Sequence, residues 1–275
     1  MSASPRATAL ASTVAVSARG VAAPARGVAA PAQGGGAPAL IAVAHGSRDP
    51  RSAATMAAVV AEIATARPDL DVRLAFLDLS VPSVDQVVDE IAACGHTHAV
   101  VVPLLLGSAF HARVDLPALL EAARARHPRV RLTQADVLGP DPRLVSALRD
   151  RVAISASPAP TGVLVAAVGS SSAAANARTE RVARRLGALT GWATEICYAT
   201  AEPTIETARE RLRARGIDRP VVASWFLAPG LLTDRLRAAA PDLVHAEVIG
   251  AHRAVVEIVG DRYDAARTDP LALTA

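Results

Sequence analysis

The chain has 275 residues, of which 51% are hydrophobic, and it carries a net charge of +3 with 29 basic residues that are all arginine. This length holds one large domain or two small ones around a sizeable core. The arginines are dispersed and lack interleaved aromatic residues, which argues against nucleic-acid binding. No apolar run approaches the roughly 18 residues of a membrane span, and two distant cysteines predict a cytoplasmic protein without disulfides.

Residues 1–38 predict a disordered extension rich in alanine, proline and glycine. The heptapeptide RGVAAPA occurs twice, at 19–25 and 26–32, and no acidic residue precedes Asp49. Such a tract buries too little apolar surface to offset the conformational entropy lost on ordering. An organelle transit peptide is the alternative interpretation, although proline and glycine disfavour the amphipathic helix that it requires.

Strands and helices are predicted to alternate from Ala39 onward. The apolar run 40–44 predicts a buried strand that ends abruptly in His45-Gly46-Ser47. The elements expected after it are a helix at 51–67, a strand at 72–77, a helix between a Ser83 cap and Gly95, a strand at 99–106, a helix at 115–126, a strand at 130–135 and a helix at 142–154. This alternation is typical of a doubly wound parallel sheet.

The second half of the chain repeats the first. AHGS at 44–47 aligns with AVGS at 167–170, and ADVLG at 135–139 aligns with AEVIG at 246–250. An internal duplication predicts two doubly wound α/β domains, which we expect to face a central cleft. The predicted segments are a disordered extension at 1–38, a catalytic domain at 39–154, a linker at 155–161, a degenerate duplicate at 162–266 and a tail at 267–275.

Three potential metal ligands follow three consecutive predicted strands. His45 follows the first strand, Asp78 the second and His111 the third. The carboxyl ends of parallel strands share one edge of the sheet, where such folds bind ligands, so we expect these side chains to converge. Two imidazoles and a carboxylate suit a borderline divalent ion such as iron, cobalt or nickel and leave coordination positions open.

Three sequence blocks around these residues resemble the signature blocks of the class II sirohydrochlorin chelatases. They are AHGSRDPRS at 44–52, FLDLSVPSV at 76–84 and VVPLLLGSAFHARVDLP at 101–117. The resemblance extends over nearly all of residues 40–265 and implies two chelatase-like domains. It implies insertion of a divalent metal, with Fe²⁺ favoured and Co²⁺ as the other candidate, into the tetrapyrrole sirohydrochlorin on the way to sirohaem or cobalamin.

The resemblance also assigns roles to single residues. His45 and His111 fall on the family's metal-site histidines and are expected to bind the metal and accept pyrrole protons. Asp78 falls on an acidic position that is most often Glu in the family, so it either binds the metal or orients an imidazole. The metal is a substrate, and no tightly bound cofactor is expected.

Arginines and serines beside these ligands are the candidate substrate-binding residues, because arginine forks bind carboxylates and sirohydrochlorin carries eight of them. This set comprises Ser47, Arg48, Arg51, Ser108 and Arg113. Arg48 and Arg51 also fit an alternative in which they are only solvated residues at a helix start.

The second half lacks the predicted ligands. Val168 is aligned with His45 and Ala199 with Asp78, and no histidine occurs from 192 to 244. We therefore expect one active site per chain, with the second domain as its opposite wall, in a monomer. A metal or tetrapyrrole carrier without turnover is the competing hypothesis.

Two other motifs have a competing functional interpretation. His96 and His98 have the spacing of a metal pair, but they precede a strand and so belong to the opposite edge of the sheet. The GSSS run at 169–172 has the composition of a phosphate-binding loop or a nucleophile. Its alignment with the His45 loop favours a counterpart that has lost its ligands.

Overall fold

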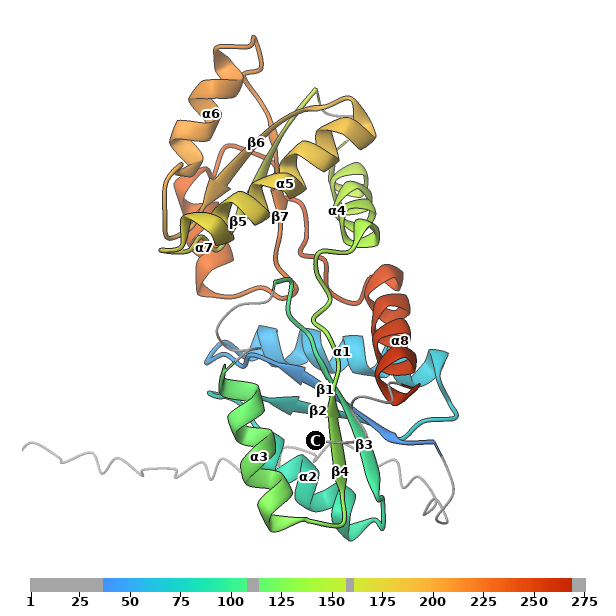
Figure 1. Ribbon diagram of the computed structural model, residues 1–275. Coiled ribbons are helices and arrows are strands. Elements are labelled where there is room, and N and C mark those ends of the chain that lie inside the picture. The colour runs from blue at the N-terminus through green and yellow to red at the C-terminus, as the bar shows by residue number, and fades with distance from the viewer. Residues whose placement is uncertain (1–36, 108–113, 157–160, 269–275) are drawn as a thin grey trace, which may run out of the picture. The chain divides into compact units, whose positions relative to one another are not determined.

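The computed structural model describes residues 37–107, 114–156 and 161–268 (Figure 1). In these ranges the strands are β1 (Ala39–Ala44), β2 (Val72–Phe76), β3 (His98–Pro103), β4 (Arg131–Gln134), β5 (Gly162–Ala167), β6 (Ala193–Tyr198) and β7 (Val221–Ser224). The helices are α1 (Pro50–Ala66), α2 (Val84–Ala93), α3 (Leu116–Arg126), α4 (Pro142–Ser155), α5 (Ala173–Thr190), α6 (Ile205–Arg213), α7 (Leu231–Ala239) and α8 (Arg253–Thr268).

The first sheet has β1 at its centre, in the order β2-β1-β3-β4, with every pair parallel. All six residues of β1 are buried, because the sheet is covered on both faces. Alternate side chains enter different cores: Leu40 and Ala42 pack with Met56 of α1, whereas Ile41 packs with Val88 of α2. The predicted doubly wound parallel sheet is confirmed.

The second sheet repeats this plan with β5 at its centre, in the parallel order β6-β5-β7. Where the first sheet has β4, the second has a single parallel bridge between Val222 and His245. The duplication is also visible in the turns, because Phe76 N donates to Pro82 O at 2.9 Å and Tyr198 N donates to Pro203 O at the same distance. The predicted internal duplication is therefore a structural one.

The last helix of each repeat packs against the other sheet. Although α4 closes the first repeat along the chain, it contacts β7 and α5, and α8 contacts α1, β3 and β4. The two repeats thus exchange their last helices. Polar contacts hold these helices in place, since Arg151 of α4 donates to Ile249 O at 2.7 Å and Tyr263 of α8 donates to Pro38 O at 2.6 Å. The predicted segments at 39–154 and 162–266 thus follow the order of the chain, whereas the packing crosses between them.

One predicted boundary differs from the structure in an instructive way. The strand expected at 99–106 ends at Pro103, although the apolar run continues to Leu106. Leu104 stays buried after the strand ends, and Leu105 O accepts from Leu138 N at 3.1 Å, so the run is apolar because of packing and not because of pairing. The Ser83 cap is confirmed as a capping box with Gln86.

None of the described helices has both the length and the apolar character needed to cross a membrane.

Candidate metal centre

His45 and Asp78 lie together at the carboxyl edge of the first sheet. His45 directly follows β1, Asp78 follows β2, and His45 Nδ1 is 3.0 Å from Asp78 Oδ1. The two side chains are 45% and 50% exposed, so both reach the solvent-accessible surface of this edge. When the imidazole donates its Nδ1 proton to the carboxylate, its lone pair is at Nε2, which is the arrangement of a histidine ligand oriented by a carboxylate.

Gly46 allows the two loops to approach this closely. Its φ is +99°, and a Cβ atom at this position would lie 1.8 Å from Asp78 O. A residue with a side chain would therefore need both an unfavourable backbone conformation and a displaced β2 turn. The backbone completes the contact, since Asp78 N donates to His45 O at 3.1 Å.

Ser80 fastens the same two loops through its hydroxyl group. Ser80 Oγ accepts from Ser47 N at 3.0 Å and donates to Ser47 O at 2.9 Å. Ser80 is not among the functional residues predicted from the sequence. Its signal is a small hydroxyl residue in the turn between the acidic residue and the proline of the second block, at a point where two strand ends meet.

The residues after Ser47 begin α1. Ser47 Oγ accepts from Asp49 N at 3.1 Å, and the Asp49 carboxylate caps the helix by accepting from Arg51 N at 2.9 Å. The hydrogen bond from the Arg51 side chain lowers the pKa of Asp49, so this cap stays ionised. Ser47 thus supports the loop from within, in addition to any contact with substrate.

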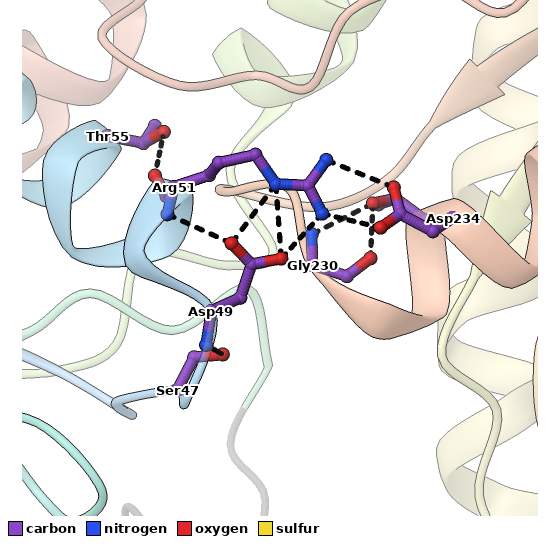
Figure 2. Close-up of polar contacts among 7 residues, drawn as sticks. Ser47, Asp49, Arg51, Thr55, Gly230 and Asp234 are labelled. Atoms are coloured by element: carbon purple, nitrogen blue, oxygen red, sulfur yellow. Dashed lines mark hydrogen bonds and ion pairs between the residues drawn. The ribbon is translucent and has the colours of Figure 1, made fainter. Parts of the chain in front are cut away.

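Arg51 is held by two carboxylates, as Figure 2 shows. Its guanidinium group donates to Asp49 and to Asp234 in the first turn of α7, with 2.5 Å between Arg51 Nη2 and Asp234 Oδ2. These hydrogen bonds, first to Asp49 and then to Asp234, raise the pKa of Arg51. The arginine predicted to grip substrate therefore already has two acidic partners.

Arg48 differs from Arg51 in this respect. Its side chain is exposed, and within the described ranges no hydrogen bond or ion pair engages it. Of the two arginines beside His45, Arg48 is thus the one whose guanidinium group is available to a carboxylate-bearing ligand.

Three predicted residues, Ser108, His111 and Arg113, lie outside the described residues. The structure therefore brings together His45 and Asp78 of the predicted ligand set. Among the described ranges, no group of three or more His, Cys, Asp or Glu side chains is arranged to hold a metal ion.

The loop of the second lobe corrects one part of the predicted alignment. Thr200 N donates to Val168 O at 3.0 Å, as Asp78 N does to His45 O, so Thr200 and not Ala199 is the counterpart of Asp78. The slip by one position arises because the turn from Thr200 to Pro203 has one residue fewer than the turn from Asp78 to Pro82. Neither a carboxylate nor an imidazole occupies these two positions of the second lobe.

His96 and His98 do not form a pair. His96 Nε2 is 3.1 Å from Asp71 Oδ2, while His98 Nε2 is 3.0 Å from Thr133 Oγ1. Burial, assisted by the charge of Arg131, lowers the pKa of His98 to about 4, so this imidazole is neutral at physiological pH. Both residues serve the amino edge of the sheet and not the candidate centre.

Comparisons with known proteins identify the family to which both repeats are similar. The family model CbiX matches residues 39–155 and again residues 162–266. A protein of Priestia megaterium named sirohydrochlorin cobaltochelatase is 30% identical over 72% of this chain and 67% of its own length. A sirohydrochlorin ferrochelatase of the same organism is 27% identical over 80% of this chain and 87% of its own length.

Solved structures support the fold. SirB from Bacillus subtilis, solved with Fe³⁺, superposes with a TM-score of 0.71 at 24% identity, covering 84% of this chain and 96% of its own. A cobalt complex of SirB from Bacillus subtilis subspecies spizizenii superposes with a TM-score of 0.68, covering 86% and 97% of the two chains at 23% identity. With both repeats matched by one family model and the paired loops in place, the chain belongs to the CbiX family.

Proposed function

We propose that this protein inserts a divalent metal ion into sirohydrochlorin. The observation that carries the proposal is the His45–Asp78 pair, an exposed imidazole held by a carboxylate at the sheet edge where α/β folds bind ligands. The names of the curated relatives, which include both a cobaltochelatase and a ferrochelatase, support the same reaction.

The chemistry divides between binding the ion and removing protons. The ion gives up water for His45 and His111, reaches one face of the macrocycle and replaces two pyrrole N–H protons, which leave the site through a nitrogen base. A neutral imidazole is both a ligand and a base near physiological pH. Formation of the metal–nitrogen bonds drives the reaction, so no nucleotide is consumed.

Asp78 is best placed as the group that orients His45. The 3.0 Å contact uses one carboxylate oxygen and leaves the other to balance the charge of the incoming ion. This choice between the two roles expected for Asp78 follows from its contact with the imidazole, and a direct bond between Asp78 and the metal is the alternative.

The substrate carboxylates are gripped in this proposal by Arg48, with Arg113, Ser47, Ser108 and Arg51 as further candidates. Arg48 comes first because its guanidinium group is exposed and unengaged within the described ranges, whereas Arg51 binds Asp49 and Asp234. Replacing Arg48 therefore tests this part of the proposal more directly than replacing Arg51.

Fe²⁺ is the first candidate metal and Co²⁺ the second. Two imidazole nitrogens and a carboxylate oxygen accept either ion, and affinity order alone does not select between them. We further propose a cytoplasmic monomer in which the second lobe is the opposite wall of the tetrapyrrole cleft. Both described cysteines are free thiols, which supports a reducing compartment.

The visible spectrum of sirohydrochlorin tests the proposed function. With Fe²⁺ or Co²⁺ in excess and protein at about one hundredth of the tetrapyrrole, an enzyme converts the whole spectrum to that of the metal complex. A non-catalytic carrier changes the spectrum only in proportion to the protein added. The second result would reject the enzyme and support the carrier.

A further inference from the structure

Leu79, beside the candidate centre, has a backbone conformation and an exposure that metal binding does not explain. It is the one non-glycine residue with a positive φ, +55°, in the described ranges, and its side chain is 56% exposed. An L-residue in the left-handed region carries a steric cost that glycine avoids and asparagine tolerates. Scattered exposed leucines need no explanation. A leucine that is more than half exposed gains little burial in the free protein to offset this cost.

The turn that carries Leu79 is fixed on both sides. Ser80 N donates to Asp78 O at 2.6 Å across it, and the Ser80 hydroxyl group makes its two hydrogen bonds to the Ser47 backbone. Leu79 therefore projects from a held position, directly after the carboxylate that contacts His45. A residue held in an unfavourable conformation next to a site points to a role in that site.

The second lobe supplies an internal comparison for this turn. There the segment from Thr200 to Pro203 is one residue shorter, and no described non-glycine residue in it has a positive φ. The lobe that has lost the imidazole and the carboxylate thus also lacks the extra residue. The left-handed leucine accompanies the metal-binding residues.

We propose that Leu79 packs against the tetrapyrrole ring and sets the affinity for it, a role that rests on the proposed function. Val81, two residues on, is a second exposed apolar residue in this turn, at 78% exposure. The carboxylates of sirohydrochlorin lie on the periphery of its ring, whereas the ring itself presents apolar faces. An apolar side chain next to the residues that handle the ion at the ring centre meets such a face, while the arginines meet the carboxylates.

The discriminating variant is Leu79→Asn. Asparagine is close to leucine in shape and adopts the left-handed region readily, so the turn is kept or improved while the apolar contact is lost. We expect the KM for sirohydrochlorin to rise about ten-fold, because roughly half of a leucine side chain loses its burial in the complex. The KM for Co²⁺ should change by less than about two-fold, since no metal-binding atom is altered.

Two further variants control this result. Leu79→Met keeps the apolar surface, so its KM for sirohydrochlorin should lie well below that of Leu79→Asn. Leu189→Asn replaces a leucine that is 49% exposed on α5, away from the His45 loop, and should leave both KM values at those of the wild type.

Sirohydrochlorin binding without metal, followed by its absorbance, separates the two proposals. If Leu79→Asn is folded and binds sirohydrochlorin as tightly as the wild type, the role of Leu79 is overturned. If the wild type binds the tetrapyrrole but does not metallate it, the proposed function fails, and the binding titration still decides the role of Leu79.

Discussion

The loop after β1 and the loop after β5 share a backbone and differ in chemistry. In both, a glycine with φ near +90° follows the strand, and the strand-end residue accepts a hydrogen bond from the neighbouring turn. In the first lobe the two side chains at this junction are His45 and Asp78, and in the second they are Val168 and Thr200. The backbone contacts therefore belong to the fold shared by both lobes, whereas the imidazole and the carboxylate are the groups that the proposed function requires of the first lobe alone.

Exchange of residues between the loops tests this separation, and the largest effect is expected for His45→Val. This variant gives the first loop the residue of the second and removes the proposed metal ligand and proton acceptor. We expect kcat/KM for chelation to fall about 10³-fold, within the range for loss of an acid–base group. Steady-state chelation assays measure it, and His127→Val, which changes a histidine paired with Asp89, is the control.

Chelation by His45→Val at the wild-type rate would show that the imidazole is no part of the reaction. The same substitution should leave the free energy of unfolding close to that of the wild type, because the second loop already folds with valine at this position.

The glycines test the shared backbone. Gly46→Ala places a Cβ atom 1.8 Å from Asp78 O, whereas Gly169→Ala meets side-chain atoms of Tyr198 and Ala201 at 2.9 and 3.0 Å. The overlap is much deeper at Gly46 than at Gly169, so we expect about 3 kcal/mol of destabilisation for Gly46→Ala and about 1–2 kcal/mol for Gly169→Ala. Urea unfolding measures both, and equal losses would mean that the β2 turn is not fixed.

Asp78→Thr gives the first lobe the residue that the second lobe has at the equivalent position, Thr200. Thr200 donates to Val168 O at 2.8 Å, so a threonine has a hydrogen-bond acceptor in this geometry and the loop should fold. Loss of the carboxylate that orients His45 is expected to weaken Co²⁺ binding about 10–100-fold. Metal titration of the purified protein measures this, with Thr200→Asp as the control that should leave Co²⁺ binding at the wild-type level.

Arg48→Ser is the exchange with the smallest expected effect. Ser171 occupies the position of Arg48 in the second loop. Loss of an exposed guanidinium group should raise the KM for sirohydrochlorin about five-fold, and added salt should reduce the difference. Arg51→Ser should have a weaker effect on this KM, since Arg51 is already held by Asp49 and Asp234. The reverse order would assign the substrate carboxylates to Arg51.

Much of this fold could be predicted from local sequence patterns. Apolar runs, the Ser83 capping box and the repeated AHGS and AVGS segments all report on neighbours close along the chain or on a duplicated neighbourhood. The pairing of His45 with Asp78 could be predicted for the same reason, because parallel strands bring their carboxyl ends to one edge.

What escaped prediction depends on distant partners and on conformation. Asp234, the partner of Arg51, is 183 positions away and on another repeat, where no local pattern indicates it. The alignment of Thr200 with Asp78 required the hydrogen bonds of the backbone, because a one-residue difference in turn length leaves little trace in a divergent repeat. The left-handed conformation of Leu79 could not be predicted either, because leucine rarely adopts it.

The exchange of α4 and α8 has a consequence for how the chain loses its structure. One hydrophobic cluster contains Leu40 and Val100 of the first sheet, Val163 of the second, and Val255 and Tyr263 of α8. Unfolding of either repeat exposes apolar surface on the other, so the two repeats cannot unfold independently. We expect a single cooperative endotherm for the whole chain in scanning calorimetry, despite its origin as two copies of one unit.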